Sequence, residues 1–184
     1  MAKQYGPWQI QGTTTIFEND FFTLREDKVL KPSGQPGKYA TIQLIKGVAV
    51  LPIDEKGQVH LVTQFRYGVG RESLEVISGG IEEGETPQDA AKREAEEELG
   101  ITAKEWIPLG QMDIDTSMIN GPVHLFAAKG ITFAEPERES TEDIHRKQMS
   151  LEEAIQSVLD SEITHGPSCT LILKAAQVKD RLLG

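Results

Sequence analysis

Three acidic side chains, those of Glu94, Glu97 and Glu98, are spaced so that they gather on one face of a predicted helix. Glutamates three or four residues apart destabilise a helix by roughly 0.2–0.5 kcal/mol per pair, so the cluster requires a compensating charge. A divalent cation such as Mg²⁺ would provide one, because it binds carboxylate oxygens and water and shares its shell with substrate phosphates. The alternative is a solvated face on which Lys92 and Arg93 offset the negative charge. The charge pattern of the helix alone favours the solvated face.

The helix that carries these glutamates has clear signals at both ends. Thr86 can cap its N-terminus, Pro87 fits the first helical position, where no amide hydrogen is needed, and Gly100 ends it. One side of the helix is apolar and suits close packing on a sheet: Ala91, Ala95 and Leu99. The glutamates therefore occupy a face beside the one that we expect to be buried.

The spacing around this helix resembles the signature of the Nudix hydrolases at every fixed position. Gly79 is followed after five residues by Glu85 and, after seven more, by the run from Arg93 to Ile101. Proteins of this family hydrolyse a nucleoside diphosphate linked to another group, with Mg²⁺ or Mn²⁺ held by the glutamates of the signature. The resemblance therefore favours the metal site over the solvated face.

The resemblance also implies roles for single residues. Glu94 and Glu98 would be the principal metal ligands, and Glu97 would be a further ligand or a carboxylate in the layer behind them. The backbone carbonyl at the position of Ser78 is a metal ligand in the family. Gly79 and Gly100 would be structural. Glu85 and Arg93 would also be structural, as a pair that fixes the loop against the helix.

An acidic stretch follows later in the chain, between residues 135 and 145. In the family, a loop at this point delivers the general base or one more metal ligand. Glu142 is our first candidate for either role, with Glu139 in reserve, and Glu97 is the third candidate for a catalytic carboxylate. The alternative is that the stretch is an ordinary solvated acidic loop.

Substrate-binding residues are expected ahead of the signature. The run Gln64–Tyr67 resembles the ADP-ribose pyrophosphatase group, in which its arginine meets the phosphates of the substrate, so Arg66 is a candidate and Arg71 a weaker one. A structural salt bridge is the alternative for Arg66. Glu75 matches a glutamate of the same group and could hold the pocket or form a salt bridge. Ile77 and Ser78 depart from the Pro-Ala of that group.

We expect an α/β protein with two parts. Residues 1–45 form a short N-terminal β segment, and residues 46–184 form the Nudix domain with a C-terminal helix, which the resemblance implies to be an α/β/α sandwich with a mixed sheet. In ADP-ribose pyrophosphatases the N-terminal part commonly builds a dimer and a shared pocket, so a homodimer is predicted. Tyr5, Trp8 or Phe17 could stack on a nucleobase, with ordinary packing as the alternative. His60 alternates with apolar residues and is predicted to be a surface strand residue.

The composition restricts the partners. A net charge of −10 and a pI near 4.9 argue against nucleic acid or an anionic membrane as the main partner, and a phosphate substrate would need a bridging cation. Cys169 is the single cysteine, which fits a reducing compartment. With no apolar signal region and no apolar stretch of roughly 18 residues, the chain is predicted to be cytoplasmic and not bound to a membrane.

The sequence therefore predicts a Mg²⁺-dependent, or Mn²⁺-dependent, pyrophosphatase whose partner is a small nucleotide diphosphate. ADP-ribose or a related nucleotide sugar is the first substrate, giving a nucleoside monophosphate and a sugar phosphate. Residues 114–122 lack the Pro-Gly pair and the glutamate of the ADP-ribose group, so dinucleoside polyphosphates or dinucleotide coenzymes are an alternative. A nucleotide sensor without catalysis is a second alternative, which the intact glutamates disfavour.

Overall fold

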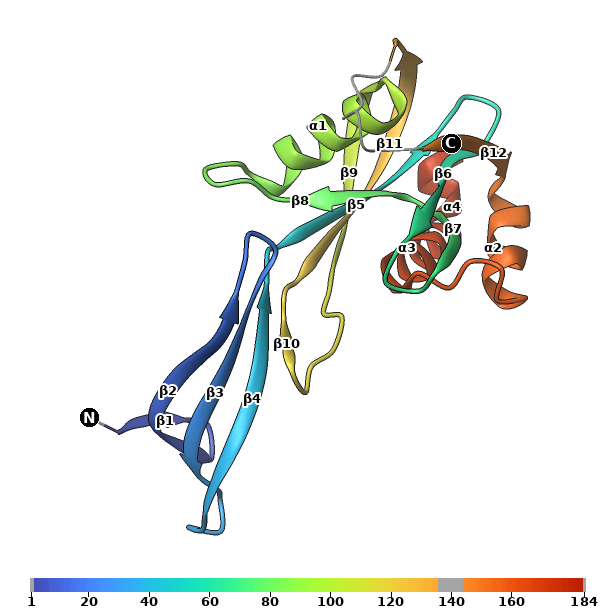
Figure 1. Cartoon of the computed structure of the whole chain (residues 1–184). Helices are drawn as coiled ribbons and strands as arrows, with labels where there is room; N and C mark the ends of the chain where they lie inside the picture. The colour runs from blue at the N-terminus through green and yellow to red at the C-terminus, as the bar shows by residue number, and fades with distance from the viewer. Residues whose placement is uncertain (1, 136–143, 184) are drawn as a thin grey trace. The chain divides into compact units, whose positions relative to one another are not determined.

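The computed structural model describes residues 2–135 and 144–183. The chain divides into two compact units, shown in Figure 1. Unit 1 comprises Met1–Ile45 and Asp113–Gly121, and unit 2 comprises Lys46–Met112 and Pro122–Gly184. The sequence had assigned residues 113–121 to the second part of the chain.

A mixed sheet forms the centre of unit 2. Among the described residues its strand order is β12-β6-β5-β11-β9, with β7 paired to β6 and β8 paired to β5. β5 and β11 run parallel, and the other neighbours are antiparallel. The strands are β5 (Gly47–Ile53), β6 (Gln58–Arg66), β7 (Arg71–Glu75), β8 (Ile77–Gly80), β9 (Ile101–Met112), β11 (Val123–Phe133) and β12 (His145–Ser150).

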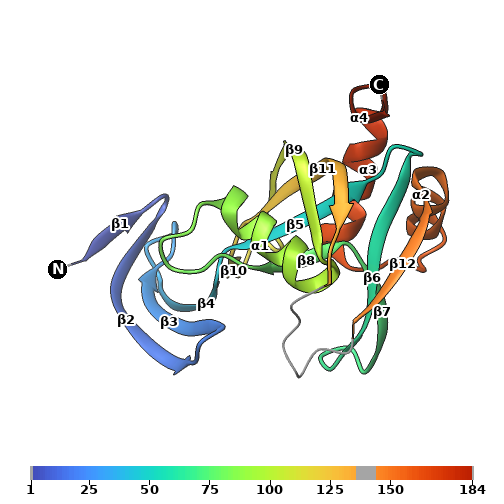
Figure 2. The same cartoon turned by 90° about the horizontal axis from the view of Figure 1, so that it is seen from above.

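Helices cover both faces of this sheet, as Figures 1 and 2 show. They are α1 (Pro87–Leu99), α2 (Leu151–Leu159), α3 (Gly166–Gln177) and α4 (Lys179–Leu183). Alternate residues of β5 point to opposite sides: Val48 and Val50 pack in the cluster that includes α1, whereas Ala49 and Leu51 pack in the cluster that includes α2 and α3. The predicted α/β/α sandwich with a mixed sheet is confirmed.

The helix ends follow the sequence closely at α1. Thr86 caps it, Pro87 is its first residue, and Gly100, at φ +62°, ends it by donating its N–H to carbonyls in the last turn. Ser150 and Glu153 form a capping box at the start of α2. The predicted single C-terminal helix is instead two helices, because α3 ends at Gln177, Val178 is its C-cap, and α4 starts at Lys179.

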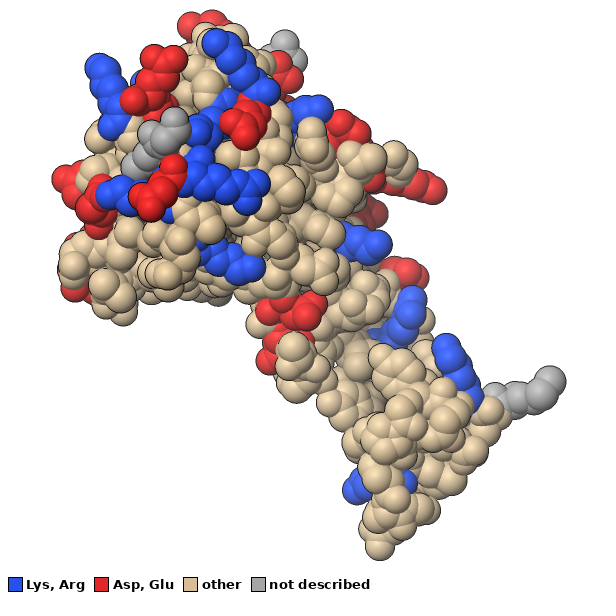
Figure 3. All heavy atoms as spheres, turned by 180° about the vertical axis from the view of Figure 1, so that it is seen from behind, with Lys and Arg blue, Asp and Glu red and all other residues tan. Residues whose placement is uncertain are grey.

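Unit 1 is one sheet with no helix on it in the described chain. Its strand order is β1-β2-β3-β4-β10, and β10 joins β4 in parallel. Val29 is the only hydrophobic side chain of its described residues that is buried. Figure 3 shows a face of unit 1 with few charged side chains. The strands are β1 (Lys3–Tyr5), β2 (Trp8–Glu18), β3 (Phe22–Leu30), β4 (Pro36–Leu44) and β10 (Ile119–Asn120).

His60 does not lie on the surface, contrary to the prediction from its alternation with apolar residues. Its side chain is 2% exposed, its ring packs edge-on against Phe133, and Nε2 lies 3.3 Å from Asp54 Oδ2. The alternation misled because this stretch of β6 is covered on both faces, so that Val59, His60 and Leu61 are all buried. In the described parts of the chain, no helix is long and apolar enough to cross a membrane.

Burial of His60 predicts a pH dependence of stability. Desolvation lowers the pKa of His60 below that of a free histidine and Arg146 adds to this effect, although the hydrogen bond and charge of Asp54 oppose it. The unfolded chain then binds more protons than the folded one just below about pH 6.5, so the unfolding free energy should fall as the pH is lowered through that value. Urea unfolding at several pH values measures this loss.

The variant His60→Gln should lose less stability on acidification than the wild type. An unchanged pH dependence in His60→Gln would assign the effect to other groups.

Candidate active site

The loop between β8 and α1 is closed by its own groups. The Glu82 N–H donates to Glu85 Oε2 at 3.0 Å, and the Glu85 N–H donates to the Glu82 carbonyl at 3.1 Å. The Thr86 hydroxyl then accepts the Asp89 N–H at 3.2 Å and lies 2.6 Å from Asp89 Oδ2. These contacts fix the position of the Glu85 carboxylate at the entrance to α1.

Arg93 joins this loop to the glutamates of the helix. Its Nε and Nη2 donate to the two oxygens of Glu85 at 2.9 and 3.1 Å, and Nη2 also donates to the Gly80 carbonyl at 2.8 Å. Its Nη1 donates to Glu94 at 2.8 Å and to Glu97 at 2.9 Å. The Glu85 hydrogen bonds, helped by Glu94 and Glu97, raise the pKa of Arg93 against the effect of desolvation. The same contact lowers the pKa of Glu85, so both groups are charged.

Glu94 lies directly against the backbone of β8. A Cβ built on Gly79 would overlap the Glu94 carboxylate, so any side chain at position 79 would push that carboxylate away. Gly79 does not have the positive φ that often explains a glycine. The glycine is required by the close approach of Glu94, which holds the carboxylate between a strand and a helix.

Glu98 is the most buried of the three helical glutamates. Its residue is 4% exposed, whereas the side chains of Glu94 and Glu97 are 13% and 42% exposed. The described residues contain no group of three histidine, cysteine or acidic side chains that converge as a ready metal site. The donors are nevertheless hard carboxylate oxygens on adjoining turns, which fit a cation that completes its shell with water and substrate oxygens.

The candidate substrate residues form a separate cluster at the β6–β7 hairpin. Arg66 donates from Nε and Nη2 to the two oxygens of Glu75 at 3.1 and 2.6 Å, so the structural salt bridge is present. Burial would raise the pKa of Glu75, but the hydrogen bond from Arg66 and the charge of His165 lower it. Arg71 donates to the Thr164 hydroxyl at 2.7 Å.

The remaining predicted site residues are Ser78, Glu139 and Glu142. Ser78 lies in β8, opposite Ala49 of β5, and directly precedes Gly79, the residue that the Glu94 carboxylate approaches. Glu139 and Glu142 lie outside the residues that the structure describes.

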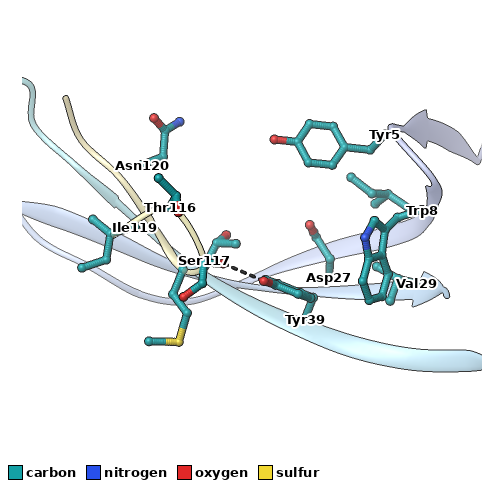
Figure 4. Close-up of a pocket in the computed structure, with 12 residues that line it drawn as sticks. Tyr5, Trp8, Asp27, Val29, Tyr39, Thr116, Ser117, Ile119 and Asn120 are labelled. Carbon is teal, nitrogen blue, oxygen red and sulfur yellow. Dashed lines mark hydrogen bonds between the residues drawn. The ribbon is translucent and has the colours of Figure 1, made fainter. Parts of the chain in front are cut away.

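Unit 1 contains a cleft of about 260 Å³ that the sequence did not predict as a whole. Its lining includes Tyr5, Trp8, Asp27, Tyr39 and Ser117 (Figure 4). The Trp8 and Tyr39 rings meet edge to face at 5.4 Å, and the Tyr39 hydroxyl donates to the Ser117 carbonyl at 2.6 Å. No local signal marked Tyr39, since its partners Trp8 and Ser117 come from distant parts of the chain.

Phe17, the third aromatic candidate for nucleobase stacking, is not among the residues that line this cleft. Its ring packs on Phe22 at 5.4 Å, and its side chain is half exposed. Tyr5 and Trp8 are therefore the candidates that the structure brings to a cleft.

Comparison with known proteins identifies the family. The family described as "NUDIX domain" matches residues 43–167. The chain belongs to the Nudix family. A second family, described as "Nucleoside diphosphate sugar hydrolase N-terminal domain", matches residues 8–42, which lie within unit 1. Divalent-metal dependence is general among Nudix hydrolases.

Two curated Nudix relatives and one solved structure place the chain further. An ADP-ribose pyrophosphatase of Bacillus subtilis is 30% identical over 91% of this chain and 91% of its own length. An ADP-ribose pyrophosphatase of Haemophilus influenzae is 35% identical over 86% of this chain and 81% of its own length. The crystal structure of an ADP compounds hydrolase has the same fold, with a TM-score of 0.85, 17% identity and coverage of 99% of this chain and 100% of its own.

The contact between Gly79 and Glu94 gives a direct prediction. Gly79→Ala should displace the Glu94 carboxylate and lower the unfolding free energy by about 1 kcal/mol, because the flexible end of Glu94 can move but loses its hydrogen bond with Arg93. Urea unfolding measures the change. Gly12→Ala is the matched control, since nothing lies within 4 Å of a Cβ there, and it should stay within about 0.5 kcal/mol of the wild type. Equal effects of both substitutions would contradict the assigned role of Gly79.

Proposed function

We propose that this Nudix protein hydrolyses the diphosphate bond of ADP-ribose or a related nucleotide sugar, giving a nucleoside monophosphate and a sugar phosphate. The observation that carries the proposal is the arrangement around Arg93. This residue binds Glu85, Glu94 and Glu97, and the Glu94 carboxylate lies against Gly79 of β8. The names and high coverage of the two curated relatives support the choice of substrate.

Mg²⁺, with Mn²⁺ as a substitute, is the proposed cofactor. Glu94, Glu97 and Glu98, with the carbonyl of Ser78, would hold it, and it would neutralise the diphosphate and activate water. The protein's own contribution is positioning. Arg93 offsets the charge of the helical glutamates and keeps two of them on the side of the helix that faces the loop.

The remaining roles follow the sequence. Arg66 and Arg71 would bind the phosphates, since a guanidinium matches two phosphate oxygens at once. Glu75 is buried and would act on the substrate through Arg66. Glu142, or Glu139, would orient or deprotonate the attacking water, with Glu97 as the third candidate. Within unit 1, Tyr5 and Trp8 line a cleft and stay the candidates for stacking on a nucleobase.

Dinucleoside polyphosphates and dinucleotide coenzymes are the second group of substrates, because residues 114–122 depart from the ADP-ribose pattern. Part of this loop lines the aromatic cleft, including Thr116 and Ser117. A difference at this loop would therefore change the lining of that cleft. The non-catalytic sensor is a third reading, in which the same nucleotides bind without turnover.

The metal assignment is tested by Glu98→Gln. With ADP-ribose and Mg²⁺, this substitution should lower kcat/KM by about 10²-fold or more, because it removes a charged oxygen donor. Glu96→Gln changes the same charge on the exposed side of the same helix and should retain near wild-type turnover. A panel that adds a dinucleoside polyphosphate and a dinucleotide coenzyme ranks the substrates.

The proposal fails if Glu98→Gln keeps wild-type turnover, or if both substitutions are equally harmful. Nucleotide binding by calorimetry without hydrolysis under any divalent cation would instead support a sensor. Hydrolysis in oxygen-18 water identifies the phosphorus that is attacked.

We also propose that residues 1–45 take part in forming a homodimer. The sheet of unit 1 leaves large apolar side chains in solvent, among them Ile16, Phe17 and Phe21, the last of which is 68% exposed. A sheet that buries one hydrophobic side chain of its own gains little free energy alone, and a second copy of the chain would cover this surface.

The single cysteine, Cys169, supports a reducing compartment such as the cytoplasm.

Light scattering at micromolar concentration tests the dimer. The wild type should have twice the mass of one chain, and Phe21→Asp should lower the mass toward that of a monomer, because a charge cannot be buried in an apolar interface. Leu159→Asp is the control, since Leu159 is 64% exposed on α2 in unit 2 and should leave the mass unchanged. A monomeric wild type would overturn the proposal.

A further inference from the structure

A buried polar cluster connects the β6–β7 hairpin to the first turn of α3. Figure 1 labels the strands and the helix that it joins. The cluster contains Glu75, whose side chain is 2% exposed, and Ser168, which is fully buried. His165 Nδ1 lies between them, 3.3 Å from Glu75 Oε2 and 2.8 Å from Ser168 Oγ. Ser168 Oγ also accepts the N–H of Val76 at 3.0 Å. The start of α3 therefore contacts both the side chain of Glu75 and the backbone that follows it.

His165 Nδ1 has a hydroxyl and a carboxylate as neighbours. Glu75 is ionised, because Arg66 binds both of its oxygens. Nδ1 is hydrogen-bonded to Ser168 Oγ at 2.8 Å, and it lies within ion-pair distance of Glu75 Oε2, at 3.3 Å. The bond to Ser168 holds the imidazole against the Glu75 oxygen that accepts Arg66 Nη2.

Thr164, which precedes His165 in the connector between α2 and α3, contacts the second candidate arginine. It accepts a hydrogen bond from Arg71 Nη2 at 2.7 Å. Thr164 and His165 therefore contact the first and last residues of β7, Arg71 and Glu75. Arg66 is held through Glu75, and 38% of its side chain is exposed. An arginine fixed in this way loses less conformational entropy when it binds an anion.

Resting on the proposed function, we infer that His165 is a positioning residue for diphosphate binding: it fixes Glu75, Glu75 fixes Arg66, and Thr164 fixes Arg71. The connector between α2 and α3 thereby sets the place of both arginines before the substrate arrives. Its contribution is to ground-state binding of the phosphates, so its loss raises KM more than it lowers kcat.

Steady-state kinetics on the full chain with ADP-ribose and Mg²⁺ test this role. His165→Ala should raise KM about tenfold and change kcat less than about twofold. His165→Asn should restore most of the affinity, because the asparagine amide can hydrogen-bond Ser168 from about the position of Nδ1 and keep a polar group beside Glu75. Cys169→Ala is the control for the same turn of α3: its thiol contacts the Ile163 carbonyl and neither arginine, so KM should not change.

A second measurement does not depend on turnover. In nitrogen-15 NMR spectra, the Arg66 Nε–H signal, assigned by its absence in Arg66→Lys, reports the hydrogen bond to Glu75 Oε1. It should exchange slowly with water in the wild type and in His165→Asn, and faster in His165→Ala. An unchanged signal in His165→Ala overturns the inference, as does an unchanged KM in a variant that keeps its melting temperature.

The two proposals can fail separately. A wild type that hydrolyses no nucleotide diphosphate removes the proposed function, and the Arg66 signal then still decides whether His165 positions the arginine. A wild type that is active, with a His165→Ala variant of equal KM, removes the positioning role alone. A loss of affinity that His165→Asn does not restore assigns the effect to packing and also overturns it.

Discussion

The site depends on the guanidinium of Arg93, which donates hydrogen bonds to three carboxylates and one backbone carbonyl. Arg93 reaches Glu85 from the loop, the Gly80 carbonyl from β8, and Glu94 and Glu97 from its own helix. A loop, a strand and a helix therefore share one partner, and their relative positions are set together. Lysine cannot replace it, because a single ammonium lacks the planar fork that binds both oxygens of Glu85.

The pairing of the strands explains why Gly79 and Gly80 lie at the end of β8, just before the loop that leads to α1. β5 and β6 meet at Ile53 and Val59 and then separate, so that β8 pairs with the first half of β5 and β7 with the second half of β6. The β7–β8 segment thereby enters the sheet between them and ends at Gly80, just before the loop that leads to α1. The buried alanines of α1, Ala90, Ala91 and Ala95, allow this helix to approach the sheet closely.

Local patterns in the sequence predicted the features that arise from neighbouring residues. The caps of α1 and its apolar side are encoded within about two dozen positions, and the family signature adds the pairing of Glu85 with Arg93 and the predicted role of the glutamates. The features that were missed depend on distant partners. Ser168 and Val76 are 92 residues apart, and Tyr39 and Ser117 are 78 apart. His60 was misjudged because alternation shows which side a residue faces, and does not show that both sides are covered.

The path of residues 113–121 has a consequence for how the two units can be exchanged between relatives. The chain leaves unit 2 after β9, adds β10 to the edge of β4, and returns at Pro122. A chimera that replaces only the first 45 residues would keep β10 beside a foreign sheet and lose Gln43 and Tyr39, the partners of Asn120 and Ser117. The unit that recombination would have to transfer intact is therefore discontinuous, and natural variation at the two segments is expected to be correlated.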